Sequence, residues 1–192
     1  MLRGEFEITL LQQGQPVVTY SVPNTNQIEG LRHLINYIFK KTDTTVRTWY
    51  VGLISARSYS TITVDDTGAS HAGWYEYTGY WVNGTHGHRA PINIPVQQAN
   101  PGFGTGPTVS IRDFAITTST SKPIQFNAPG TLIRGVFVTS ARSHNVAGVL
   151  VGTAIFSVGG EPLFNHGDEM MFQYRWRWDT EIGVWSEDSI GP

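Results

Sequence analysis

The chain has 192 residues, of which 40% are hydrophobic, 12% aromatic and only 15% charged, and its formal net charge at pH 7 is −2. This length suits one substantial domain, and the slightly negative charge argues against a nucleic-acid-binding protein, which normally has a basic face. The lack of cysteine excludes disulfides and thiolate metal sites, and no apolar run is long enough for a signal peptide or a membrane-spanning helix.

The low share of charged residues predicts that part of the surface is covered by partners. The 21 glycines and 10 prolines indicate many strands and turns. We expect a protein that is made in a cytoplasm and stays there until it is assembled or released.

The amino-terminal segment is predicted to form a β-hairpin. Apolar and polar residues alternate over residues 6–10 and again over residues 18–22, as in half-buried strands. A turn at residues 13–16 would join them.

One helix is predicted over residues 27–41. Asn26 would cap it, and Glu29 would complete a capping box. Apolar residues recur at helical spacing along one side of the segment: Ile28, Leu31, Leu34, Ile35, Ile38 and Phe39. We expect this stripe to pack against a sheet, because core packing is a commoner use of such a stripe than a ligand groove.

Residues 47–80 are the stretch around which the chain is organised. A strand is predicted at residues 47–55, with apolar residues on both faces, so that it should be covered on both sides. A polar loop over residues 56–68, with a short predicted strand at residues 61–64, leads to the motif Ser70, His71, Ala72, Gly73 and Trp74. We interpret the motif as a structural corner whose small residues let the backbone approach closely while the tryptophan fills the core.

Turn signals separate the remaining strands. Asn83 and Gly84 between short strands predict a tight two-residue turn, which we favour over a glycosylation acceptor at the same place. Residues 89–107 are rich in proline, glycine, asparagine and glutamine and predict a long loop or arm inserted in the domain. Further strands are predicted at residues 108–116, 123–128, 131–140, 149–158 and 168–178, followed by a polar tail at residues 179–192.

The whole pattern predicts an all-β, mainly antiparallel fold. We expect a jelly-roll-like β-sandwich with one amphipathic helix near the amino terminus, built as a single domain over residues 1–192.

Two groups of motifs resemble those of a family of tailed-bacteriophage virion structural proteins. The first is TWYVGL at residues 48–53 followed by ASHAGW at residues 69–74. The second is a strand ending in Pro-Gly, then TLIRGVFVTS at residues 131–140 and LVGTAIFSVGG at residues 150–160. The similarity extends over most of the chain.

The resemblance implies a non-enzymatic capsid decoration, or cement, protein on the outer surface of the phage head. Such a protein would act as a homotrimer, bind the major capsid protein and stabilise the capsid, with neither nucleic acid nor membrane as a partner. A tail or head-fibre component, either an adaptor or a glycan- or receptor-binding module, is the alternative. A glycan-processing enzyme is a third class. Copy number per virion would separate the first two.

Contacts with partners are expected from the loop at residues 89–107 and from the tail at residues 179–192. The candidate interface residues are Trp185, Phe103, Trp81 and Arg89. Trp185 offers a large apolar anchor for a pocket on a neighbour.

Histidines are the best candidates for metal ligands. His86 and His88 could share one face of a strand, with a third ligand from His71, His144 or His166. Since no cysteine or acidic cluster accompanies this pair, we favour a polar loop beside a turn and expect no metal or other cofactor.

Other chemistry is poorly supported by the sequence. Asp65 and Asp66 lack the spaced ligands of a calcium loop, which favours a solvated loop with an Asx turn. Ser70, His71 and Asp113 have the residue types of a catalytic triad, but the sequence contains no G-x-S-x-G nucleophile elbow to support one. We therefore expect no enzymatic activity.

Overall fold

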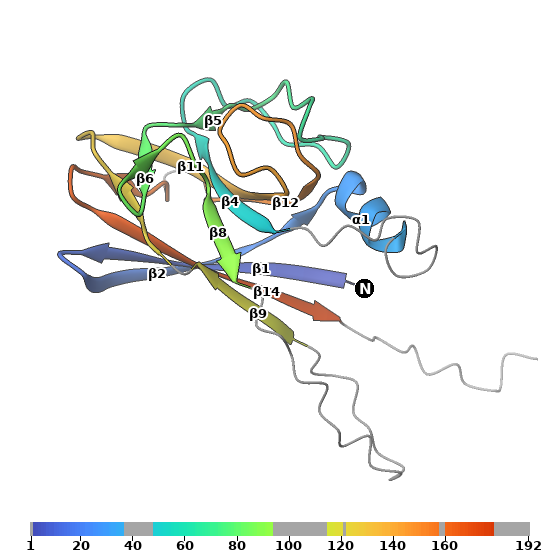
Figure 1. Cartoon of the computed structure of the whole chain (residues 1–192), viewed down its shortest axis with the longest axis horizontal. Coiled ribbons are helices and arrows are strands. Elements are labelled where there is room, and N and C mark those ends of the chain that lie inside the picture. The colour runs from blue at the N-terminus through green and yellow to red at the C-terminus, as the bar shows by residue number, and fades with distance from the viewer. Residues whose placement is uncertain (1, 37–47, 94–114, 121, 158–159, 179–192) are drawn as a thin grey trace, which may run out of the picture.

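The structure is a computed structural model that describes residues 2–36, 48–93, 115–120, 122–157 and 160–178 (Figure 1). Its elements in chain order are β1 (Leu2–Gln12), β2 (Gln15–Pro23), β3 (Thr25–Asn26), α1 (Ile28–Ile35), β4 (Trp49–Ser55), β5 (Glu76–Tyr77), β6 (Tyr80–Val82), β7 (Thr85–His86), β8 (Ala90–Asn93), β9 (Ala115–Thr120), β10 (Ile124–Phe126), β11 (Thr131–Thr139), β12 (Leu150–Ile155), β13 (Leu163–Phe164) and β14 (Glu169–Trp178). The fold is all-β with one short helix, as the sequence predicted.

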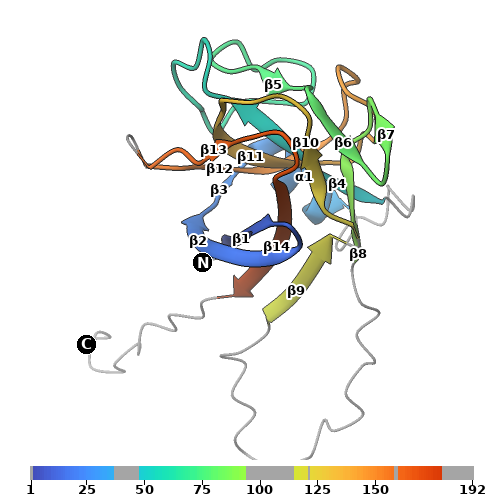
Figure 2. The ribbon, with the colours of Figure 1, turned by 90° about the vertical axis from the view of Figure 1, so that its left-hand side faces the viewer.

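The strands form a mainly antiparallel sandwich of the jelly-roll-like class. Hydrogen bonds connect them in the order β3-β12-β11-β4-β8-β9-β14-β10-β6-β7, and β14 also pairs with β1, which pairs with β2. In Figures 1 and 2, β1, β2, β9 and β14 form one layer, and β4, β11 and β12 belong to the other.

The two layers are joined at both sides. On one side β8 pairs with β4 and also with β9. On the other side β2 leads through Asn24 into β3, which pairs with β12 of the opposite layer. The sheet therefore runs around the core rather than ending in two separate sheets.

The core lies between the layers, with a smaller cluster outside β4. Val51 and Leu53 of β4 belong to the main core, whereas Ile54 packs with Trp74, Phe137 and Leu150 in the second cluster. The prediction that β4 is covered on both faces is confirmed.

Two predicted tight turns are also confirmed. Gln13 and Gly14 have φ angles of 51° and 76° between β1 and β2, and Asn83 and Gly84 have φ angles of 50° and 73° between β6 and β7. Such positive φ angles at both central positions belong to the hairpin turns that Asn-Gly favours.

Helix α1 packs on the sheet as predicted, but its predicted capping was wrong. Its N-cap is Gln27, without a side-chain cap bond. The carboxylate of Glu29 instead accepts hydrogen bonds from the backbone N–H groups of Gly68, at 2.9 Å, and Leu150, at 2.7 Å. Glu29 thus ties the loop at residues 56–68 to β12. The end of the predicted helix, residues 37–41, lies outside the described residues.

Some predicted segments differ from the structure. Residues 61–64 form no strand, because Thr63 and Val64 lead into a turn around Asp66. The predicted loop at residues 89–107 was wrong at its start, where buried residues form β8; residues 94–107 lie outside the described residues. The predicted strand at residues 108–116 is described only from Ala115, where β9 begins.

Candidate functional site

Polar and aromatic side chains gather where β5, β6, β7 and the start of β8 meet the loop at residues 141–149. The centre is an ion pair between Arg89 and Glu76, whose side chains are each only 6% exposed. The guanidinium donates from Nε to Oε1 and from Nη2 to Oε2, both at 2.8 Å, which is the paired geometry that arginine and carboxylate favour.

The remaining donors of this network hold the loop at residues 141–149. Arg89 Nη1 donates to the carbonyl oxygens of Ala141, at 2.9 Å, and Val146, at 3.3 Å. The backbone N–H of Asn145 donates to Glu76 Oε2 at 3.2 Å. The Arg89–Glu76 pair therefore joins β5, β8 and this loop into one unit.

Backbone contacts reinforce this arrangement. Arg89 N–H donates to Arg142 O at 2.7 Å, and His144 N–H donates to Gly87 O at 3.1 Å. His88 and Ser143 form an isolated antiparallel bridge between the same segments. The loop is thus fixed against residues 87–89 over residues 141–146.

Beside the ion pair lies a cluster of aromatic and histidine rings. The ring of His144 is 4.7 Å from that of Tyr80 in an edge-on contact and 6.0 Å from that of His86, which is 5.7 Å from Trp81. In the part of the chain that the structure describes, the Tyr80 hydroxyl and His144 Nε2 are buried without a hydrogen-bond partner.

Burial controls the protonation of these two rings. Burial, helped by the Glu76 carboxylate and opposed by Arg89, raises the pKa of Tyr80 well above its usual value. Burial, with smaller contributions from Arg89 and His86, lowers the pKa of His144 below its usual value, although Glu76 opposes the shift. Both rings are therefore uncharged at neutral pH and act as packing groups.

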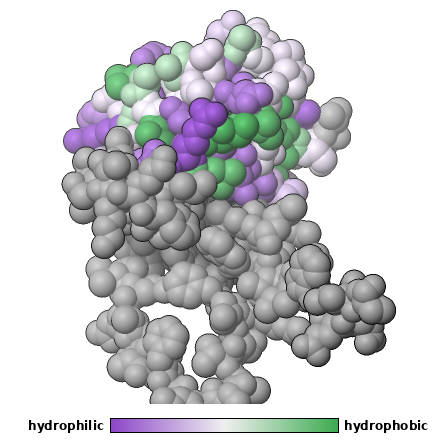
Figure 3. All heavy atoms as spheres, turned by 90° about the vertical axis from the view of Figure 1, so that its right-hand side faces the viewer, coloured by the Kyte–Doolittle hydropathy of each residue, from purple (hydrophilic) through white to green (hydrophobic). Residues whose placement is uncertain are grey.

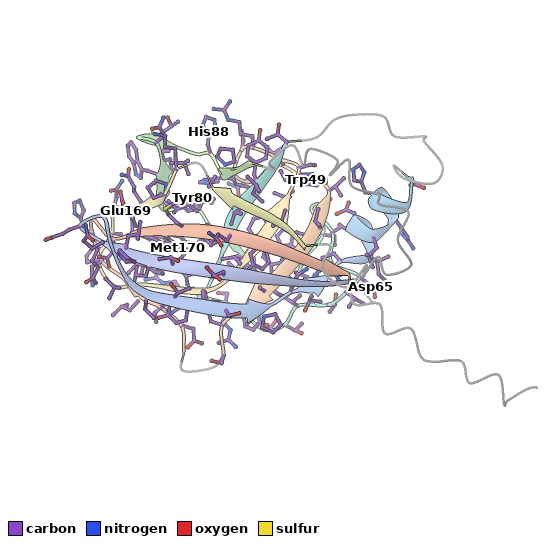
Figure 4. The ribbon with its side chains drawn as sticks, turned by 90° about the horizontal axis from the view of Figure 1, so that it is seen from below. Trp49, Asp65, Tyr80, His88, Glu169 and Met170 are labelled. Atoms are coloured by element: carbon purple, nitrogen blue, oxygen red, sulfur yellow. The ribbon has the colours of Figure 1, made fainter. Side chains whose placement is uncertain are left out.

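A pocket of about 420 Å³ opens on the outer side of this unit. It is lined by Tyr50, Val82, Asn83, Thr85, His88, Arg89, Pro91, Lys122 and Arg142, and we call it the basic pocket. None of the four rings of the cluster lines this pocket. In Figure 4, His88 of the pocket is labelled nearer the edge of the molecule than Tyr80 of the cluster.

The predicted interface residues divide into three groups. Trp81 on β6 is 37% exposed and remains available for a contact. Arg89 is only 5% exposed, and its guanidinium binds Glu76, Ala141 and Val146 within the protein, so its assignment to an interface is corrected to an internal role. Trp185 and Phe103 lie outside the described residues.

The motif at residues 70–74 is a packed corner. Trp74 is 1% exposed and donates from Nε1 to Asp66 Oδ2 at 2.8 Å. The ring of His71 stacks on Trp74 at 3.9 Å. A Cβ added to Gly73 would lie 2.3 Å from the carbonyl oxygen of Thr61, which explains the glycine.

Among the described residues, the candidate metal ligands come together only in part, with the rings of His86 and His144 6.0 Å apart. No group of three or more ligands that could hold a metal ion occurs there. His86 faces Trp81, and Asp66, considered for calcium, instead accepts bonds from Thr63 and Trp74. Asp113, which was considered with Ser70 and His71 for a catalytic triad, lies outside the described residues.

The sequence did not single out Glu76, and it indicated Arg89 only as an interface residue rather than as half of a buried ion pair. Glu76 is a lone acidic residue between two tyrosines, and Arg89 precedes an apolar run. Charges in such aromatic or apolar surroundings are a usable signal for a buried pair. Lys122 and Arg142 lie in ordinary polar loops, where the sequence offers no comparable signal.

A scan against protein-family models, a search of curated protein sequences and a search of solved structures each returned no match for the chain. Within the described ranges, the single helix is too short and polar to pass through a bilayer.

Proposed function

We propose that the protein is a non-enzymatic structural protein of a tailed-bacteriophage virion. Its role would be that of a decoration protein that binds the major capsid protein on the outside of the head, acts as a homotrimer and stabilises the capsid. The motifs at residues 48–53, 69–74, 131–140 and 150–160 support this origin by resemblance.

One structural observation carries the proposal: the Arg89–Glu76 pair anchors the backbone that bears exposed apolar side chains. Tyr75, next to Glu76, is 59% exposed, and Val146, whose carbonyl accepts from Arg89, is 51% exposed. Interfaces gain most from apolar anchors that lose little freedom on binding. A rigid platform with such anchors suits a protein that bridges neighbouring subunits and resists outward pressure.

Other surface features agree with a covered surface. Trp81, on the same end of the sandwich, is partly exposed, and Leu132 and Leu163 form an exposed cross-strand pair between β11 and β13. The face of the molecule toward α1 also shows a hydrophobic patch beside hydrophilic side chains (Figure 3).

The test combines light scattering with attachment to phage heads that lack the protein. We expect a trimer in solution and saturable binding to the heads. Val146→Ser and Trp81→Ala should weaken trimerisation or binding, whereas Val17→Ser, at an equally exposed position on β2, should not. A monomer that fails to bind heads would refute the proposal.

The second candidate is a tail or head-fibre component with a glycan- or receptor-binding role. The basic pocket favours it, because a concave, polar pocket is unnecessary for a protein that only cements subunits. Hundreds of copies per virion would favour the head, and about a dozen would favour the tail.

A further inference from the structure

We propose that the basic pocket binds a carboxylate-bearing sugar residue, such as the uronic acids of acidic polysaccharides. This inference goes beyond the decoration role and does not depend on where in the virion the protein sits. It rests on the charge, the neutral polar groups and the rigidity of the pocket.

The pocket has an excess of positive charge. Lys122 and Arg142 both line it and are both exposed, and within the described ranges neither has an ion-pair partner. The charge of Arg89 is matched by Glu76, so it adds little. None of the described lining residues is acidic. Free arginine and lysine groups at one pocket select an anion, and arginine binds carboxylates through two parallel hydrogen bonds.

Neutral polar groups stand beside these cations. Tyr50, Thr85 and Asn83 line the same pocket, and their hydroxyl and amide groups can both donate and accept hydrogen bonds. Val82 and Pro91 supply apolar surface. A sugar acid presents this combination: one carboxylate, several hydroxyls and an apolar ring face.

The volume suits a ligand larger than a simple ion. About 420 Å³ falls within the usual range of small-molecule pockets, which is roughly 300–1,000 Å³. A single inorganic anion would use only the cations and would leave the neutral groups without a role.

An acidic peptide fits less well. Peptides commonly gain affinity by adding a strand to a free sheet edge. Of the strands that line the pocket, β8 already pairs with β4 through residues 90–92 and with β9 through Ile92 and Asn93. Strand β7, which ends the sheet, is only 2 residues long. The pocket therefore offers side-chain groups rather than a strand edge long enough for a peptide.

The pocket is held ready for a ligand. The carbonyl of Arg142 accepts the backbone N–H of Arg89 at 2.7 Å, and the neighbouring Ala141 carbonyl accepts from the buried guanidinium. Asn83 sits in the tight β6–β7 turn with φ 50°. These anchors reduce the ordering that binding would otherwise require.

The test is calorimetric titration of the full chain with methyl β-D-glucuronide, its neutral counterpart methyl β-D-glucoside, and a short glutamate-rich peptide. We expect the glucuronide to bind at least about tenfold more tightly than either comparison compound, with affinity falling as salt rises. Arg142→Gln and Lys122→Gln should each weaken glucuronide binding by about fivefold or more.

Arg57→Gln is the matched control, since Arg57 is equally exposed but lies outside the pocket. It should leave binding unchanged, and melting curves of all three variants establish that the fold is kept. Should Arg142→Gln lose its fold, Arg142→Lys keeps the charge and should still bind more weakly than the original protein. Equal binding of the glucoside, preference for the peptide, absence of glucuronide binding, or full affinity in both pocket variants would each overturn the proposal.

Discussion

Glu76→Gln tests the view that a buried ion pair organises the functional end of the sandwich. The substitution nearly keeps the side-chain volume but removes the charge that faces Arg89. Because both side chains are only 6% exposed, water cannot solvate the charge of Arg89 once its charged partner is removed. The relevant precedent is therefore a broken buried pair, which lowers the free energy of unfolding by about 3–5 kcal/mol, rather than a surface pair at about 0–1 kcal/mol.

The loss should be measured by urea denaturation and by thermal melting. In a protein of this size, each kcal/mol lowers the melting temperature by about 2–4 °C, so the expected decrease is about 6–20 °C. Asp65→Asn, the same chemical change at an exposed position, should alter the free energy of unfolding by no more than about 0.5 kcal/mol.

A double substitution separates the pair from its surroundings. Glu76→Leu combined with Arg89→Met removes both charges, and it should destabilise the protein by less than the two single changes added together. A loss of less than about 1 kcal/mol in the free energy of unfolding for Glu76→Gln, or simple additivity of the two single changes, would show that the ion pair does not organise this end of the sandwich.

Three further predictions concern packing and protonation. Tyr80→Phe should leave the free energy of unfolding unchanged or raise it, because the Tyr80 hydroxyl is buried without a partner among the described residues. Tyr77→Phe should lower the free energy of unfolding by about 0.5–1.5 kcal/mol, because it removes hydrogen bonds to Gly79 and Thr131. Urea denaturation in which Tyr80→Phe is the less stable of the two variants would contradict this. Gly30→Ala should destabilise the protein despite the better helix propensity of alanine, since the new Cβ would lie 2.6 Å from Val151 Cα, and an unchanged or raised melting temperature would refute this packing. The lowered pKa of His144 means that the unfolded chain takes up a proton near pH 6.5 before the folded protein does, so stability should fall as pH drops below that value. His144→Phe should reduce this slope in pH-dependent melting, and an unchanged slope would contradict the prediction.

The local pattern of the sequence was sufficient for several of the strands, although not for β8. Alternation over residues 6–10 and the two-sided apolar pattern of residues 49–55 depend only on near neighbours, and the Asn83-Gly84 turn depends on two residues. These features reappear in the structure because the pleat of a strand and the φ angles of a turn are local properties.

The hydrogen bonds and the ion pair that join distant parts of the chain could not be predicted in this way. Glu29 lies in the position of a capping-box residue, yet its carboxylate binds backbone groups 39 and 121 residues further along the chain. The partners of Arg89 lie 13, 52 and 57 positions away in the sequence. Such contacts are set by the topology of the whole sheet, which no short motif encodes.

The basic pocket also depends on residues that lie far apart in the sequence. Tyr50 comes from β4, Thr85 from β7, and Lys122 and Arg142 from separate loops. These residues meet only because β8 lies beside β4 while the Arg89–Glu76 pair draws the loop at residues 141–149 against it. Nothing in the sequence near Lys122 and Arg142 indicates that these two residues lie at the same pocket.

A reconstruction of the virion decides whether the protein is a decoration protein of the head. We expect this sandwich on the outer surface of the head, as trimers in hundreds of copies, with Tyr75 and Val146 at contacts between neighbouring subunits. Density for the protein only at the tail, in about a dozen copies, or its absence from the particle would contradict a decoration role.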